Sequence, residues 1–282
     1  MSPLWYWRYI PCFGIELDFE DFNVYEFNGR PVLYIKRNDN ARKRSLLQKH
    51  IQHDPLGSFK KIDQIDFEIG LSSIEGDGNF NLDYVHFFYF LILIKTEGWI
   101  SAPAILTHST LEDPEIEGRH VYCSSFIEAA PVFHERILLT LDDVKWIKSH
   151  MDTATKFVRD SRFQNAMQAL TSFHCIPYAS TSLVVAWSGL EALFGAQHEI
   201  SFRLSLYITN FIKSGNDRQP EFEKLRKSYD SRSRVAHGAA TKAKRLREQA
   251  TYTRNILREC LKKMHRNKFI PRSKETYISI RQ

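Results

Sequence analysis

Hydrophobic and polar residues alternate along the first 139 residues in the pattern of half-buried β-strands. Two such runs, Phe22–Phe27 and Pro31–Arg37, flank an Asn28-Gly29 pair, which is typical of a tight β-hairpin. The continuous apolar run Tyr84–Lys95 is rich in aromatic residues, so we expect it to form a buried strand. Further strands are expected at Ile65–Leu71, Ile100–Thr107, Val121–Ala129 and Arg136–Leu139, with one helix near residues 40–52.

The periodicity changes at Thr140. Thr140 and Asp143 match a helix-starting capping box, and Val144, Ile147 and Met151 follow at spacings of three and four residues. Five more helices are expected: one carrying Phe163 to Phe173, then Ser182–Phe194, about Phe202–Ile212, about Glu221–His237, and Thr241–Asn267. The pattern therefore predicts an α+β protein with a β-rich N-terminal domain (residues 1–139) and an all-helical bundle (residues 140–282).

Composition agrees with two globular domains. The chain has 282 residues, of which 43% are hydrophobic and 26% charged, which excludes a disordered protein. Its longest uncharged apolar run, Tyr84–Ile94, is far shorter than the roughly 20 residues of a membrane span, and no signal-peptide pattern opens the chain. We expect a cytoplasmic protein. The cysteines are widely scattered and predict free, buried thiols: Cys12, Cys123, Cys175 and Cys260.

Charge is divided unequally along the chain. Residues 1–140 carry a net charge of −7 and residues 141–282 a net charge of +13. A polyanion such as nucleic acid is one expected partner for the basic half, and a solvated basic helix face is the alternative. The last helix is itself basic. Its cationic residues are Lys242, Lys244, Arg245, Arg247, Arg254, Arg258, Lys262, Lys263 and Arg266.

Arg232 and His237 form an Arg-x4-His pair. Roughly one such pair is expected by chance in a chain of this composition, so its context decides its weight. Gly238 directly after His237 is a natural helix stop, which places the histidine in the last helical turn. A five-residue step turns about 500°, so the two side chains point about 140° apart, and two copies facing each other would bring them together. The buried face of this helix is expected to carry Phe222, Leu225, Tyr229 and Ala236.

Two segments resemble the ApeA-like HEPN domain family over about residues 142–266. The first is Ser182-Leu-Val-Val-Ala-Trp-Ser-Gly-Leu-Glu-Ala-Leu-Phe194, a buried helix ending in a Leu-Glu-Ala-Leu-Phe type sequence. The second, about 40 residues later, is Tyr229-Asp-Ser-Arg-Ser-Arg-Val-Ala-His-Gly238, an Arg-Ser-x-x-x-His-Gly type sequence. The family usually has branched aliphatic residues before the histidine, where this chain has Val235-Ala236.

The resemblance implies a metal-independent endoribonuclease that works as a homodimer without a cofactor. RNA carries its own nucleophile in the 2′-hydroxyl, so its cleavage needs a proton carrier and a cation, which suits His237 and Arg232. Arg234 and Arg226 are candidates for flanking phosphates. Glu191 is either a polar member of the site or a group paired with an arginine of the bundle. The family further suggests antiviral defence by a toxin that degrades tRNA or other host RNA after a phage-derived trigger.

Two other functions fit the same residues. One is a non-catalytic HEPN module that binds RNA or a partner protein, which would tolerate replacement of Arg232 or His237. The other is a ligand sensor whose helical half only dimerises, which predicts no affinity for RNA at physiological salt.

Overall fold

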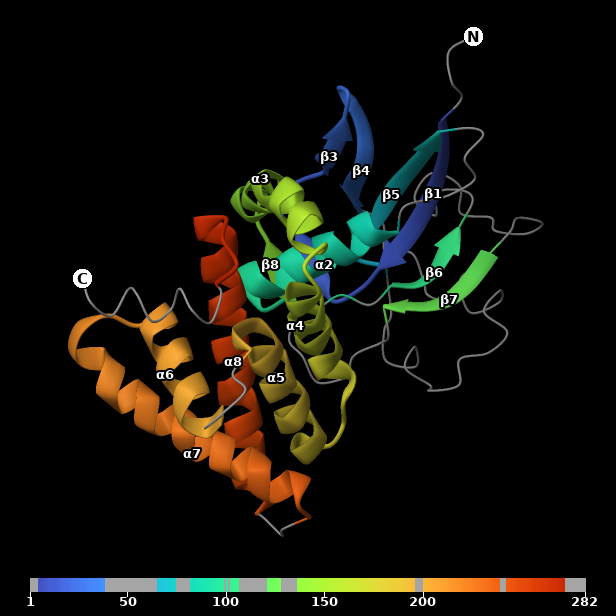
Figure 1. The fold of residues 1–282 in the computed structure, drawn as a ribbon. Helices are drawn as coiled ribbons and strands as arrows, with labels where there is room; N and C mark the ends of the chain where they lie inside the picture. The colour runs from blue at the N-terminus through green and yellow to red at the C-terminus, as the bar shows by residue number, and fades with distance from the viewer. Residues whose placement is uncertain are drawn as a thin grey trace. The chain divides into compact units, whose positions relative to one another are not determined.

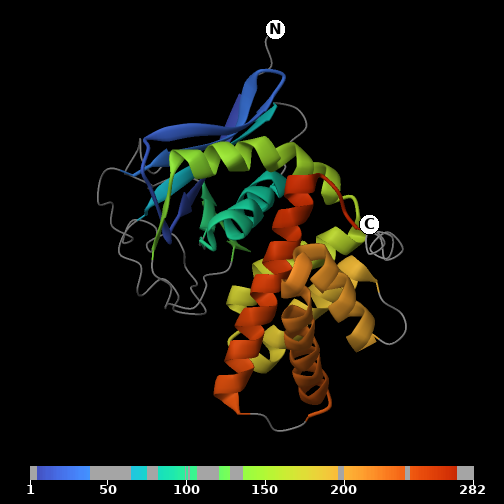
Figure 2. The ribbon, with the colours of Figure 1, turned by 90° about the vertical axis from the view of Figure 1, so that its left-hand side faces the viewer.

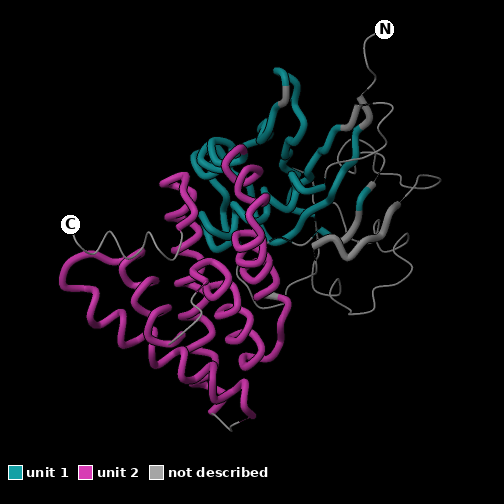
Figure 3. The backbone as a smooth tube through the Cα atoms, in the orientation of Figure 1, with its two compact units in different colours: residues 1–151 teal, residues 152–282 magenta. Residues whose placement is uncertain are grey.

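The computed structural model describes residues 5–38, 65–74, 82–98, 100, 102–106, 121–127, 136–195, 200–238 and 242–271. The chain forms two compact units, residues 1–151 and 152–282 (Figure 3). Its strands precede most of its helices, so the predicted α+β class is confirmed (Figure 1). Strands give way to helices at Thr140, as expected, and the division by packing falls later, inside helix α3 (Leu141–Phe157).

An antiparallel sheet of six strands forms the first unit, in the order β3-β4-β5-β1-β6-β7. Two short strands, β2 and β8, pair in parallel as a second sheet. The strands are β1 (Trp5–Cys12), β2 (Ile15–Leu17), β3 (Asp21–Phe27), β4 (Arg30–Arg37), β5 (Phe67–Ile74), β6 (Ala102–Leu106), β7 (Val121–Ile127) and β8 (Ile137–Leu139). The predicted strands other than the apolar run are confirmed, β1 and β2 were missed, and the expected helix near residues 40–52 lies outside the described residues.

The predicted hairpin joins β3 to β4. Asn28 and Gly29 have φ angles of 51° and 73°, both in the left-handed region. A two-residue turn of the type that matches strand twist requires positive φ at both positions, and Asn-Gly is the pair that adopts it most readily. The sequence signal was therefore correct for a specific backbone reason.

Helix α2 (Asp83–Thr96) replaces the strand expected at Tyr84–Lys95, so that prediction was wrong. Every residue from Phe87 to Ile94 is buried, which removes the amphipathic period that distinguishes a helix from a strand. The helix lies against the sheet, where Tyr84 stacks on Tyr25 of β3 at 4.7 Å between ring centroids (Figures 1 and 2). Length was the better guide, because a run of this size exceeds a typical strand.

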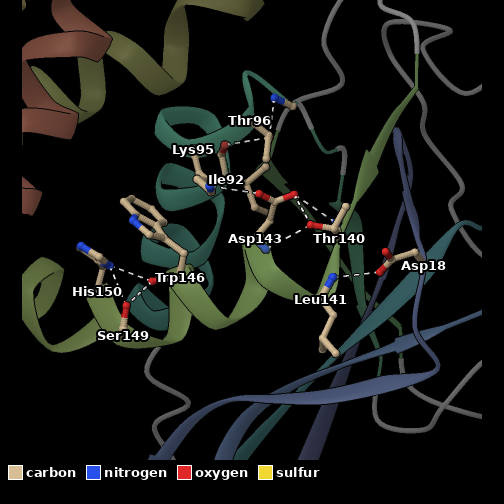
Figure 4. A network of polar contacts seen from close by, with 11 residues as sticks. Asp18, Ile92, Lys95, Thr96, Thr140, Leu141, Asp143, Trp146, Ser149 and His150 are labelled. Carbon is tan, nitrogen blue, oxygen red and sulfur yellow. Dashed lines mark hydrogen bonds and ion pairs between the residues drawn. The ribbon is translucent and has the colours of Figure 1, made fainter.

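The capping box that starts α3 is present (Figure 4). The Asp143 carboxylate accepts hydrogen bonds from Thr140 N (3.1 Å) and Oγ1 (2.7 Å), while Asp143 N donates to Thr140 Oγ1 (3.2 Å). Asp18, next to β2, accepts from Leu141 N at 2.9 Å, and Lys95 of α2 pairs with Asp143 at 3.3 Å. The helix start is thus tied to two other parts of the first unit, the residue after β2 and helix α2.

The second unit is a helical bundle, and each of its predicted helices is confirmed. They are α4 (Ser161–Ser172), α5 (Ala179–Phe194), α6 (Ile200–Ile212), α7 (Arg218–Ala236) and α8 (Ala243–Asn267). Helix α5 is the core helix, as expected. A Cβ on its Gly189 would lie 2.9 Å from both Ala169 Cβ of α4 and Leu257 Cδ2 of α8, so the glycine lets three helices approach closely.

The described cysteines are free thiols, as predicted. Cys12 and Cys260 are buried, and burial raises the pKa of both. Cys175 is half-buried, so the expectation of a buried thiol was wrong there. The Cys123 side chain lies outside the described residues.

Candidate active site at the end of helix α7

Helix α7 carries both members of the Arg-x4-His pair. The helix ends at Ala236, and His237 caps it with a backbone N–H that donates to the carbonyls of Ser233 (3.1 Å) and Arg234 (3.2 Å). Gly238 follows with a φ of 76°, a left-handed stop that glycine adopts without strain. The predicted position of His237 in the last turn is therefore confirmed.

The buried face of α7 differs from the predicted one. Leu225 is fully buried, whereas Phe222 and Tyr229 are half-buried and Ala236 is exposed. Two serines, Ser228 and Ser231, occupy the remaining buried positions. Expecting Ala236 on the buried face was wrong, because the last turn of α7 is exposed at Arg234, Ala236 and His237.

Arg232 forms an ion pair with Glu191 of α5. Its Nη2 lies 3.2 Å from each carboxylate oxygen and donates a hydrogen bond to Oε2. The two side chains are 23% and 27% exposed, so the pair sits at the edge of the bundle. The interpretation of Glu191 as a group paired with an arginine of the bundle is confirmed, and that arginine is the one from the motif. Its membership of an active site stays a prediction.

Aromatic rings support this ion pair. The Arg232 guanidinium carbon lies 5.5 Å from the centre of the Tyr229 ring, and Trp187 packs edge-on against that ring at 5.0 Å. Burial raises the pKa of Tyr229, and the negative charge of Glu191 raises it further. The guanidinium is thus held between a carboxylate and a ring face, which fixes its orientation.

Trp187 also starts a chain of hydrogen bonds across three helices. Its Nε1–H donates to Ser228 Oγ (3.2 Å), and that hydroxyl shares a hydrogen bond with Thr253 Oγ1 of α8 (2.8 Å). Thr253 Oγ1 in turn donates to the backbone carbonyl of Gln249 (2.8 Å). This network locks the registers of α5, α7 and α8 directly beside the motif.

The other candidate residues are not brought together with Arg232. The His237 side chain is exposed, and within the described ranges no hydrogen bond or ion pair is made by its ring. Arg234 and Arg226 are also exposed, and the Arg226 guanidinium carbon lies 5.9 Å from the centre of the Phe222 ring. One chain therefore offers Arg232 and His237 at the same helix end but pointing to different sides.

The basic residues of α8 divide into two groups. Those of the first two turns are exposed, together with Arg266, whereas the middle ones are half-buried. Arg254 lies over the Phe173 ring at 5.6 Å, and burial lowers its pKa. Lys263 lies over the Phe211 ring at 5.5 Å. The exposed cations that remain near the motif are Lys242, Lys244, Arg245 and Arg247.

Sequence reasoning missed Gln249 and the hydroxyls of Ser228 and Thr253. Polar residues on the buried stripe of a helix were the available signal, since Thr253 and Gln249 accompany Leu246 and Ala250 there. Among the described residues, no group of three or more His, Cys, Asp or Glu side chains is arranged to hold a metal ion.

No family model, curated protein or solved structure matches this chain. None of the described helices combines the length and the apolar character that crossing a membrane requires.

Proposed function

We propose that the protein is a metal-independent endoribonuclease of the HEPN type. The observation that carries the proposal is the end of α7, where Arg232 is oriented by Glu191 and Tyr229 and His237 is exposed in the last turn. A fixed, partly exposed guanidinium suits phosphate binding, and an accessible imidazole suits proton transfer. The exposed cations at the start of α8 support a polyanionic substrate.

The chemistry needs nothing else from the protein. The 2′-oxygen of the substrate attacks the adjacent phosphorus, giving up its proton to a base, and the 5′-oxygen leaves after accepting a proton. His237 moves protons, and Arg232 stabilises the extra negative charge on the phosphorane. The products are a 2′,3′-cyclic phosphate and a 5′-hydroxyl. Arg234 and Arg226 are assigned to flanking phosphates.

The active form in this proposal is a homodimer. Arg232 and His237 diverge by about 140° around the axis of α7. With side chains of this length, one chain cannot easily place both on the same phosphate. Two α7 helices that face each other across a two-fold axis bring the arginine of one copy to the histidine of the other. The resemblance to HEPN proteins supports the same arrangement, with tRNA or other RNA as the target.

The test is cleavage of total bacterial RNA with a chelator present. Wild-type protein is compared with Arg232→Ala and His237→Ala, and with Arg159→Ala and His150→Ala as matched controls away from the motif. Loss of at least about a hundredfold in both motif variants, with cyclic-phosphate ends from the wild type, supports the proposal. RNA left intact by every protein, with and without phage lysate as a trigger, rejects it.

The ion pair also favours a second function. A guanidinium held by a carboxylate is the usual state of a structural arginine, and this fits a non-catalytic module that binds RNA or a partner protein. Such a module predicts RNA binding or partner capture that survives His237→Ala. A cytoplasmic role in defence against phage, released by a phage-derived trigger, belongs to the nuclease proposal and rests on the family resemblance.

A further inference from the structure

Two polar layers cross the second unit one helical turn apart. The first layer is the chain of Trp187, Ser228 and Thr253, in which each side chain has a hydrogen-bond partner. It joins α5, α7 and α8, which lie together in the bundle (Figures 1 and 2). Because its hydrogen bonds are complete, this layer fixes the register of the three helices at the neighbouring turn.

The second layer consists of Glu191, Arg232 and Gln249. Glu191 and Arg232 each follow a member of the first layer by four residues, while Gln249 precedes Thr253 by four. Helices α7 and α8 are consecutive and run in opposite directions, so a step back along α8 matches a step forward along α7. Residues four apart share a helix face, which places Gln249 level with Arg232.

The second layer is incompletely bonded. Arg232 Nε and Gln249 Oε1 are buried atoms that lack a hydrogen-bond partner among the described residues, whereas Glu191 Oε1 has the ion-pair contact with Arg232 Nη2 at 3.2 Å. Leaving a buried polar atom unsatisfied costs about 1–3 kcal/mol, so two in one layer is a substantial departure from the first layer. The donor Arg232 Nε and the acceptor Gln249 Oε1 complement each other.

We propose that Gln249 is a positioning residue that acts through Arg232. Gln249 Oε1 and Arg232 Nε are not hydrogen-bonded to each other in the structure; a rotation of the Gln249 side chain would let its carbonyl accept a hydrogen bond from Arg232 Nε, while Glu191 still accepts one from Nη2. Acceptors at both positions fix the plane of the guanidinium and leave the Nη1 protons for a ligand. That this ligand is a phosphodiester of RNA rests on the proposed function, whereas the pairing of Gln249 with Arg232 does not.

The pairing is tested by hydrogen exchange of the arginine Nε–H group in the full-length protein. The Arg232 signal in a ¹⁵N NMR spectrum is assigned by its loss in Arg232→Lys. Gln249→Met keeps the length of the side chain but lacks the carbonyl, and Gln249→Glu keeps an acceptor. We expect exchange at least about threefold faster in Gln249→Met than in wild type, and no acceleration in Gln249→Glu.

Glu248→Gln, at the exposed neighbouring position, is the control and should exchange as wild type does. Equal exchange in Gln249→Met and wild type would overturn the inference. Cleavage is measured on the same proteins, where Gln249→Met should lose about tenfold in kcat/KM and Gln249→Glu should retain more activity. Altered exchange with no cleavage by any protein leaves the pairing standing and rejects the nuclease proposal.

Discussion

Glu191 competes with any phosphate that approaches Arg232, because its carboxylate already lies 3.2 Å from the guanidinium Nη2. Glu191→Gln removes the charge and keeps a hydrogen-bond acceptor, so we expect RNA affinity to rise. Unit charges a few ångströms apart near a protein surface interact by about 1 kcal/mol or more, which corresponds to roughly a fivefold lower Kd. The measurement is fluorescence anisotropy with labelled RNA, in a His237→Ala background that prevents cleavage.

Replacing the exposed Glu248 with Gln removes the same charge from a neighbouring surface and controls for a general effect on net charge. Affinity that is equal in the two variants would mean that Glu191 does not compete for the ligand of Arg232.

Asp66 makes the first unit sensitive to pH. Burial raises its pKa from 3.8 to about 6, against the hydrogen bond donated by Gly14 N (2.5 Å) and the charge of Arg136 at 3.4 Å. Because the folded pKa lies above the unfolded one, this group stabilises the fold fully below about pH 4, and that contribution is lost as pH rises through 6. The contribution is on the order of 2–3 kcal/mol.

Asp66→Asn cannot titrate, so we expect a flatter dependence of unfolding free energy on pH between 4 and 7 than in wild type. Urea denaturation at a series of pH values gives both curves. Asp142→Asn, at a side chain 93% exposed, should follow the wild-type curve. Parallel curves for wild type and Asp66→Asn would show that the carboxyl is not perturbed.

At the scale of helices, Gly189 sets how closely α5 approaches α4 and α8. Gly189→Ala gains about 1 kcal/mol of helix propensity and places a methyl group 2.9 Å from Ala169 Cβ, and overpacking of this kind costs about 1–3 kcal/mol. We expect a net loss of up to about 2 kcal/mol in thermal or urea unfolding. Ala169→Gly reopens part of the space but itself costs about 1 kcal/mol of helix propensity, so the double variant should lose less stability than the sum of the two single variants.

Ser188→Ala, at the exposed position beside it, reports helix propensity without crowding and should not destabilise. A Gly189→Ala protein as stable as Ser188→Ala would mean that the helices separate at little cost.

The sequence predicted elements well where a period or a turn signal was present. The hairpin at Asn28-Gly29 and the capping box at Thr140 depend on neighbouring residues, and both are found in the structure. Helix α2 was missed because burial on every side leaves no period. The pairing of Glu191 with Arg232 joins residues 41 apart in sequence, so residue type suggested candidates but could not select a partner.

Gln249 shows the same limit more sharply. Its place on the buried stripe of α8 was a signal in the sequence, but its level in the bundle follows from the Ser228–Thr253 hydrogen bond and the opposite directions of α7 and α8. The face of a helix on which a residue lies was predictable from sequence. Which residues of different helices lie at the same level could be found only from how the helices pack.

For the whole molecule, the divergence of Arg232 and His237 on α7 leads to a prediction about assembly. If each active centre takes its arginine from one copy and its histidine from the other, Arg232→Ala and His237→Ala proteins should complement each other when mixed. A mixed dimer has one centre with both residues intact and one with neither. Random exchange makes half of the dimers mixed, so activity should recover to about a quarter of that of wild type.

The control mixes Arg232→Ala with a protein that lacks both residues. Neither protein then carries an intact Arg232, so no active centre is complete and the mixture should stay inactive. Sedimentation of the mixtures verifies that dimers form and exchange. Dimers that exchange without any recovery would place both residues in one chain's centre, and α7 would then have to bend or unwind at Ser233 to bring His237 round to Arg232. Recovery of cleavage would instead show that each active centre combines Arg232 of one copy with His237 of the other, which the divergence of the two side chains on α7 makes possible.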